Sequence, residues 1–173
     1  DQFMSKKNRE WLARSIELIV EASNPDVAWD VRLMTLQTCL EMLSYVILVE
    51  QLRKLTHKQF GLNRTSINLE LLISELRVHG NVPSWWRSPT NARVSSLAEV
   101  IIGYRNLITH PTRSNLQKLR TINEWTLHDS IVWFQRSCEL AILFAVGYQG
   151  RYFDAFLGGI RSVPWSVNAS SGP

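Results

Sequence analysis

The sequence is poor in features that would place the protein outside the cell or in a membrane. It has only two cysteines, Cys39 and Cys138, which lie within apolar segments and make no disulfide framework. The longest apolar run, LAILFAV at 140–146, is far shorter than the roughly 20 residues that a membrane-spanning helix needs. No signal peptide is evident either. We therefore expect buried free thiols in a reducing compartment, a cytoplasmic location and no membrane partner.

Acidic residues are scarce in one segment. Between residues 76 and 123 the only acid is Glu99. Seven basic residues share this segment: Arg77, Arg87, Arg93, Arg105, Arg113, Lys118 and Arg120. The segment carries +6, which leaves −2 for the rest of a chain whose net charge is +4. Such a concentration of positive charge indicates either an anionic partner, most often nucleic acid, or a basic surface without a partner.

Strand-like alternation is missing as well, whereas helical periodicity fills most of the chain. It predicts helices at about 6–22, 26–52, 66–78, 96–110 and 127–148, and a short sixth helix at 151–160. The second of these is apolar on most sides in its middle, so we expect it to be the most buried. Loops are expected at 57–65 and 79–94, and a basic linker follows the fourth helix. The predicted fold is all-α, an antiparallel bundle of five to six helices.

Local signals set the ends of these helices. The SNPD turn at 23–26 fits the start of the second helix, and Ser96 opens a capping box for the fourth. Residues 126–129 fit the cap of the fifth helix. We expect a single domain over residues 1–165 and a flexible tail at 166–173. Because the chain does not begin with methionine, we expect a C-terminal fragment of a longer protein.

The stretch RNLITH at 105–110 ends the predicted fourth helix just before Pro111. At about 100° per residue, one stripe of this helix is apolar and faces the core. The stripe consists of Leu97, Val100, Ile101, Tyr104 and Ile108. The four polar residues outside it are Arg105, Asn106, Thr109 and His110. They form either a polar last turn that stops at the proline, or a site.

The residue types favour a site for phosphodiester chemistry. An arginine is a permanent ligand for phosphate with several donors, and a histidine can transfer protons near neutral pH. An asparagine can fix the side chains between them. RNA hydrolysis needs little more than deprotonation of the 2′-hydroxyl, a contact to the phosphate and protonation of the 5′-oxygen. No metal or other cofactor is required, and the sequence contains no pattern of metal ligands.

Arg105-Asn106-Leu-Ile-Thr-His110 resembles the R-x4-H motif of the HEPN superfamily in its RNxxxH form. The late position of the motif helix in an all-α bundle, with a long apolar helix downstream, fits the same resemblance. The resemblance implies a HEPN-like bundle that acts as a metal-independent RNA endonuclease. It also implies a homodimer, in which the motif faces of two chains form one composite active site. Arg105 would then stabilise the scissile phosphate, His110 would be the general base or acid, and Asn106 would position one of them.

Members of this superfamily act in toxin–antitoxin, CRISPR-associated and anti-phage abortive-infection systems, often at the C-terminal end of longer proteins. The resemblance therefore implies an upstream sensor domain or regulator. Toxin members that extend the motif to R-x4-H-x-Y are not matched, because Pro111 and Thr112 follow His110. Other members are not nucleases. Two alternatives follow: a non-catalytic module that binds RNA or nucleotides, and a structural helical dimerisation domain.

Further residues are weaker candidates. Arg113, Lys118 and Arg120 directly follow the motif and are candidate RNA contacts, as are Arg87 and Arg93 in the 79–94 loop. That loop also contains Trp85 and Trp86. Adjacent tryptophans either stack bases or fill a core or an interface. Three histidines show no ligand spacing and are expected to be structural or surface residues: His57, His79 and His128.

Overall fold

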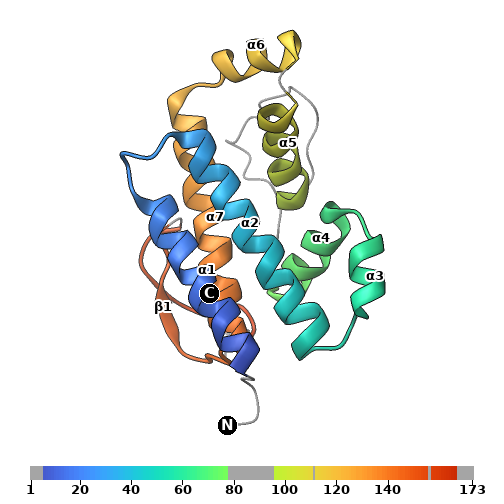
Figure 1. The fold of residues 1–173 in the computed structure, drawn as a ribbon. Coiled ribbons are helices and arrows are strands. Elements are labelled where there is room, and N and C mark those ends of the chain that lie inside the picture. Colours follow the sequence, from blue (N-terminus) through green and yellow to red (C-terminus); the bar gives the residue numbers. More distant parts are fainter. Residues whose placement is uncertain (1–5, 78–95, 111, 156, 167–173) are drawn as a thin grey trace.

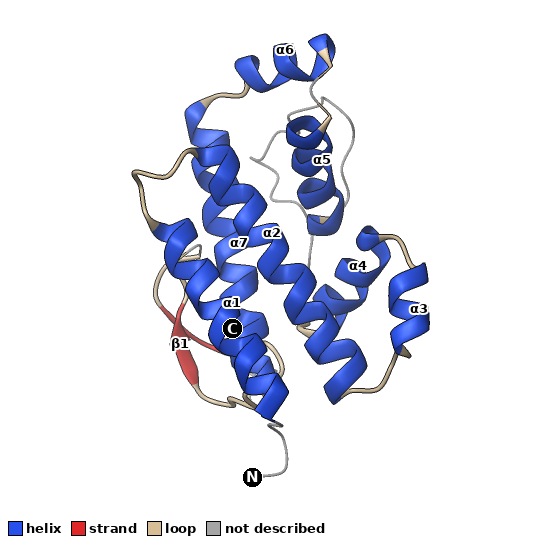
Figure 2. Cartoon of the chain, viewed as in Figure 1, coloured by secondary structure: helices blue, strands red, loops and turns tan. Residues whose placement is uncertain are grey.

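The computed structural model describes residues 6–77, 96–110, 112–155 and 157–166, and it has the predicted all-α architecture (Figure 1). These residues contain seven α-helices, one π-helical segment and a hairpin of two short strands. Figure 2 shows how small the strand content is beside the helices. Helix α2 (Trp29–Tyr45) lies in the middle, in contact with α1, α4, α5 and α7. The helix predicted to be the most buried is therefore the central one.

Several predicted features lie outside the described residues. The 79–94 loop is one of them, together with Arg87, Arg93 and its two tryptophans. His79 is another. Of the predicted tail, only Ser166 is described. The predictions for these residues stay untested.

The first two helices form an antiparallel pair (Figure 1). Helix α1 (Lys6–Ser23) begins and ends close to the predicted bounds, whereas α2 begins at Trp29, three residues later than predicted. The cause is a local turn, in which Asn24 Oδ1 accepts the backbone N–H of Asp26 at 3.0 Å. Asn24 therefore stabilises the connection and does not cap α2. The Arg32 side chain then donates to the Ala22 carbonyl at 2.6 Å and ties the two helices together.

Helix α2 continues as a π-helical segment, η1 (Val46–Gln51), whose turn is one residue wider. The Leu52 N–H accordingly donates to the Ile47 carbonyl five residues back, at 2.9 Å. At the end of η1 the Gln51 amide donates to the Ala145 carbonyl at 2.8 Å. Residues Trp29–Gln51 are long and apolar enough to cross a membrane by length and composition, but 56% of the most apolar 18-residue window within them is buried inside the molecule, as in a core helix.

A short helix stands where the pattern predicts a loop at 57–65. Helix α3 (His57–Leu62) begins at Thr56, which forms a complete capping box with Gln59. Helix α4 (Thr65–Glu75) follows at once and matches the predicted third helix closely. The buried side chain of Asn68 in α4 donates to a carbonyl of α3 at 3.0 Å, so the two helices are joined by a hydrogen bond as well as by the chain.

Three helices follow residue 96. They are α5 (Leu97–Thr109), α6 (Arg113–Thr121) and α7 (Glu124–Ala145). The predicted basic linker is wrong, because these residues form α6, capped by the Thr112 hydroxyl, which accepts the Asn115 N–H at 3.2 Å. The predicted cap of the last long helix is wrong by about one turn. Asn123 is the cap, since its side chain accepts the N–H of Thr126 at 2.7 Å.

The predicted sixth helix is also wrong. Strands β1 (Arg151–Phe153) and β2 (Ile160–Ser162) pair antiparallel in its place. Gly158 and Gly159 adopt positive φ angles of 72° and 89° before β2, a conformation that a helix excludes. An ion pair, 2.8 Å between Arg136 Nε and Asp154 Oδ2, fastens this hairpin to α7.

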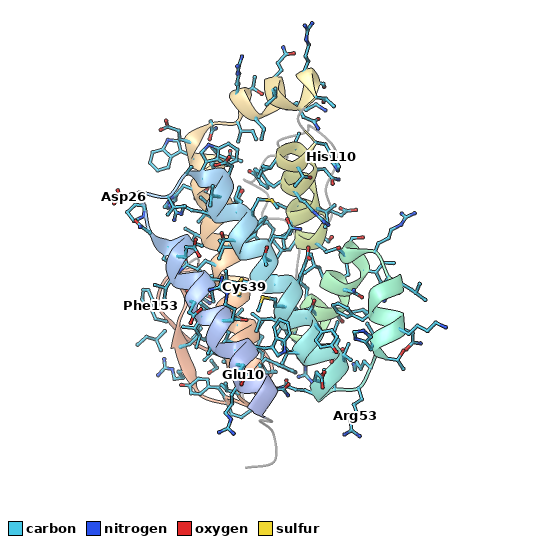
Figure 3. The ribbon with its side chains drawn as sticks, viewed as in Figure 1. Glu10, Asp26, Cys39, Arg53, His110 and Phe153 are labelled. Atoms are coloured by element: carbon cyan, nitrogen blue, oxygen red, sulfur yellow. The ribbon has the colours of Figure 1, made fainter. Side chains whose placement is uncertain are left out.

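The core lies between α2, α7, α5 and α1. Its largest fully buried side chains include Leu33, Leu36, Leu40, Tyr104 and Phe134. Both cysteines are buried and free, as predicted, and Figure 3 shows Cys39 on α2 in the middle of the molecule. Burial raises the pKa of the Cys138 thiol well above its usual value, which keeps this thiol protonated and unreactive.

Candidate functional site

Helix α5 carries the motif, and its cap and one apolar face explain how it folds. The Ser96 hydroxyl accepts the N–H of Glu99 at 3.3 Å, so the helix starts where it was predicted to start. The predicted stripe is confirmed: Leu97, Val100, Ile101 and Tyr104 are buried, Ile108 is half-buried, and Ala98 and Leu107 join them. The polar residues of RNLITH are kept off this face. Asn106, Thr109 and His110 are exposed, and Arg105 is half-buried.

Tyr104 anchors the motif helix to α7, one residue before Arg105. Its hydroxyl lies 3.0 Å from Ser130 Oγ, and the Ser130 hydroxyl donates to the Thr126 carbonyl at 2.6 Å. Because the Ser130 proton is used there, Tyr104 is the donor of the pair. Burial raises the pKa of Tyr104 to about 12, so the phenol remains protonated at neutral pH. This anchor fixes the rotation of α5 and therefore the direction of its polar side chains.

Arg105 points toward α2 and α4. Its Nη1 donates to Thr65 Oγ1 at 3.4 Å and lies 4.0 Å from Glu41 Oε1. The Arg105 side chain is still 41% exposed, so the guanidinium is open to a ligand. Thr109 folds back and donates to the Arg105 carbonyl at 2.8 Å, which is a structural role. Sequence reasoning missed Glu41 and Thr65 as neighbours of the motif, because they come from helices remote in sequence.

Asn106 and His110 lie at the other end of the motif, close to α6. His110 is the C-terminal cap of α5, and its N–H donates to the Asn106 carbonyl at 3.2 Å (Figure 3). The Asn115 side chain reaches back from α6 and donates to the His110 carbonyl at 2.8 Å and to the Asn106 carbonyl at 3.3 Å. Asn115 therefore satisfies the carbonyls that end the motif helix. It was not predicted, although Thr112 three residues earlier is a capping signal.

Within one chain the motif side chains diverge. Arg105 and His110 are five residues apart, which is about 140° around and about 7.5 Å along an α-helix. Asn106 is four residues from His110 and therefore lies on the same side of the helix. One chain supplies an arginine, an asparagine and a histidine at one helix end, but it does not enclose a ligand between Arg105 and His110.

The other predicted RNA contacts fall into two groups. Arg113, Lys118 and Arg120 all lie on α6, where Arg113 and Arg120 are exposed and Lys118 is half-buried. They are thus brought next to the motif, as α6 begins beside the end of α5 (Figure 1). Arg87 and Arg93 belong to the residues that the structure does not describe.

Metal ligands are not gathered anywhere in the described part of the chain, where no group of three or more His, Cys, Asp or Glu side chains could hold an ion. His57 Nδ1 lies 3.2 Å from the Tyr45 hydroxyl, which fits the structural role predicted for it. His128 is exposed on α7. Neither histidine belongs to the motif face on α5.

The fold is that of an all-α domain. Its helix α5 packs one apolar face against the core and presents Arg105, Asn106 and His110 at its C-terminal end. Residues 5–163 match the YopA C-terminal domain family, and the chain belongs to this family. The match spans every helix and strand described above. No curated protein and no solved structure matches the chain.

Proposed function

We propose that this domain is a metal-independent RNA endonuclease of the HEPN type, active as a homodimer. The observation that carries the proposal is the end of α5, where Arg105 is half-buried between other helices while Asn106 and His110 are exposed. A helix that merely stops at a proline does not require an arginine oriented by two neighbouring helices. The RNxxxH form of the motif and the all-α architecture support the same function. The basic helix α6 beside the motif supports RNA as the substrate.

Each motif residue has a task in this proposal. A histidine takes the proton of a ribose 2′-hydroxyl, and the 2′-oxygen attacks the adjacent phosphorus. The bond from phosphorus to the 5′-oxygen breaks, a protonated histidine returns a proton to that oxygen, and a 2′,3′-cyclic phosphate remains. The Arg105 guanidinium holds the phosphate oxygens and stabilises the negative charge that develops on them. Asn106 positions one of the two other side chains.

Two chains are proposed because the motif diverges within one. If two copies pair with their α5 helices facing, His110 of each lies opposite Arg105 of the other, and the four side chains enclose a phosphate.

The proposed setting is cytoplasmic, within a prokaryotic anti-phage or toxin system. The resemblance of RNLITH to the HEPN motif supports this setting. In such a system an upstream sensor domain or a regulator controls when the two motifs meet.

The test is cleavage of end-labelled RNA in EDTA. We expect cleavage by the wild-type protein and a loss of about 100-fold or more in both Arg105→Ala and His110→Ala. Arg105→Lys should be impaired as well, because lysine keeps the charge but loses the planar fork of donors. Arg9→Ala and His57→Gln are matched controls remote from the motif. Cleavage that survives in both motif variants, or that requires added Mg²⁺, contradicts the proposal.

A mixture of the two inactive variants tests the composite site directly. A heterodimer of Arg105→Ala and His110→Ala chains retains one Arg105 and one His110, from different chains. We expect partial recovery of cleavage on mixing. No recovery, in a mixture shown to form heterodimers, contradicts a shared active site and leaves each chain to act alone.

A non-catalytic module that binds RNA or nucleotides is the second candidate. The exposed basic residues of α6 and the 41% exposed Arg105 side chain favour it, because they can hold an anionic ligand without any chemistry. This module predicts tight, salt-dependent RNA binding without cleavage. A structural dimerisation domain predicts neither, and both motif substitutions would then change only stability.

A further inference from the structure

Helix α6 and the first turn of α7 form an exposed strip in which basic side chains adjoin one aromatic side chain. We name it the α6–Trp125 strip; it consists of Arg113, Arg120 and Trp125. None of the α6 residues is buried, and α6 contains no acidic residue. Trp125 is 78% exposed, the highest value among the large hydrophobic side chains of the described residues. A tryptophan so exposed contributes little to the core, and its apolar surface is available to a partner.

The strip begins at the motif. Thr112 caps α6 two residues after His110, and the Asn115 side chain holds the start of α6 against the last carbonyls of α5. From there α6 runs across one end of the molecule to the start of α7 (Figure 1). A helix of nine residues is about 13 Å long, so α6 alone extends roughly this far from the motif toward the start of α7.

Two basic residues of α6 lie on one surface of the helix. Arg113 and Arg120 are seven residues apart, so they share one face and are separated by about 10 Å along it. Lys118 is five residues after Arg113, about 140° around the helix, and is half-buried, so it lies off this face. The nearest acidic residues after α6 are Glu124, which is exposed beside Trp125, and Asp129, one turn after Trp125 on α7. The strip therefore has a positive face with two negative charges near its aromatic end.

We propose that the α6–Trp125 strip is the track that holds single-stranded RNA on its way to the motif. The guanidinium groups of Arg113 and Arg120 contact backbone phosphates, and a base stacks on the Trp125 indole. The choice of RNA rests on the function proposed above; the charge and the exposed indole fit any single-stranded nucleic acid. A duplex fits less well, because its bases are already stacked and present no free face to an indole.

A membrane surface is the rival partner for a basic helix next to a tryptophan. Such a helix needs a broad apolar face that enters the lipid. The only large apolar residues of α6 are Leu116 and Leu119, and Leu119 is already half-buried in the protein. The strip has charge and one aromatic side chain but no apolar face, which favours RNA.

The test measures binding of a fluorescent single-stranded RNA that is 2′-O-methylated and so cannot be cleaved, at several salt concentrations. In the double variant Arg113→Gln, Arg120→Gln, we expect the slope of log affinity against log salt to shrink by about 1.4, since each phosphate contact in a single strand contributes about 0.7. Trp125→Ala should weaken binding about tenfold without a change of slope, whereas Trp125→Phe should bind nearly as well as the wild type. Glu124→Gln should strengthen binding.

A double variant with the same change of charge is the control. Arg9→Gln, Lys58→Gln removes two exposed basic side chains on other helices. Far-ultraviolet circular dichroism verifies that every variant is folded. If the control variant loses as much affinity and slope as the strip variant, or if Trp125→Ala binds as the wild type does, the track is refuted. It is also refuted if the strip substitutions weaken binding to anionic vesicles and leave RNA binding unchanged.

A cleavage assay on unmodified RNA, run beside the binding assay, separates this inference from the proposed nuclease. Cleavage with an unaltered KM in the strip variants overturns the track and leaves the nuclease in place. Strip-dependent binding without any cleavage of unmodified RNA supports the track and overturns the nuclease.

Discussion

Removing the Asp154 carboxylate should destabilise the protein far more than removing an exposed acidic group. The carboxylate is fully buried and accepts three hydrogen bonds: from Arg136 Nε at 2.8 Å, from the Tyr152 hydroxyl at 2.7 Å and from the Leu157 N–H at 2.9 Å. Arg136 itself is only 9% exposed. Asp154→Ala therefore leaves a nearly buried positive charge on α7 without its partner and two donors of the hairpin without their acceptor.

The magnitude follows from these contacts. Removing one partner of a buried ion pair costs about 3–5 kcal/mol, because the other charge stays buried and uncompensated. We expect about 4 kcal/mol for Asp154→Ala, a large share of the 5–15 kcal/mol typical of a domain's free energy of unfolding. With a urea dependence of about 2 kcal/mol per molar, the unfolding midpoint should fall by about 2 M.

The assay is urea unfolding followed by circular dichroism, with Glu17→Ala as the control. Glu17 pairs with Arg14 at 2.8 Å, but the two side chains are 65% and 57% exposed, so its loss should cost at most about 1 kcal/mol. The double variant Arg136→Met, Asp154→Leu removes both charges and should be more stable than Asp154→Ala. If Asp154→Ala costs no more than Glu17→Ala, the buried pair does not hold the hairpin and the reasoning is wrong.

The same carboxylate predicts a pH dependence. Burial alone would raise the pKa of Asp154, but hydrogen bonds from the Leu157 N–H, Tyr152 and Arg136 outweigh burial and hold it below its usual value. A lowered folded-state pKa contributes stability above the unfolded pKa of about 4, and this stability is lost as the pH falls through the folded-state pKa. Thermal unfolding scanned from neutral to acidic pH should therefore show a smaller acid loss in Asp154→Ala than in the wild type.

Three further predictions concern the site helix and α7. Tyr104→Phe should lower the free energy of unfolding by about 1 kcal/mol in urea, because Ser130 loses its donor. This variant should also lose less stability than the wild type between pH 10 and 12. In the wild type, burial raises the pKa of Tyr104 to about 12, so the folded state resists ionisation of Tyr104 and loses stability as the pH rises through this range. Asn115→Ala should cost about 1 kcal/mol in thermal unfolding, since the carbonyls of Asn106 and His110 lose their donor, and it should lower any RNA cleavage. Burial raises the pKa of Glu139, so the contribution of Glu139 to stability falls as the pH rises past 4.5. Glu139→Gln should therefore have a higher melting temperature than the wild type at pH 7. The difference in melting temperature should shrink toward pH 4.

The helices that could be predicted from the sequence are those in which the spacing of apolar residues and a capping residue indicate the same start. For α5, Ser96 and the stripe through Tyr104 gave the start, the core face and the outward direction of Arg105 and His110. The short helices α3 and α6 contain no buried residue, so no buried apolar face distinguished them from loops. Only their caps signalled them. The strands β1 and β2 have three residues each, too few for alternation to be visible.

The candidate site was predictable in part for the same reason. Helical geometry places Arg105, Asn106 and His110 off the core without any knowledge of the other helices. The contacts of Arg105 with Glu41 and Thr65 depend on how α2 and α4 pack against α5, and no local pattern encodes that packing. The function inferred from the motif stays a prediction until RNA is tested.

The extra residue in the wide turn of η1 changes the direction in which the following side chains point. In a regular α-helix without this residue, the Gln51 side chain would point about 100° away from its actual direction around the helix axis. In its actual phase the Gln51 amide meets the Ala145 carbonyl, one of the acceptors left free where α7 ends. The π-helical segment that follows α2 thus supplies a hydrogen-bond donor to the C-terminal end of α7. Deleting one residue from Val46–Gln51 would give a more regular helix and, by the same change of phase, leave α7 without this cap.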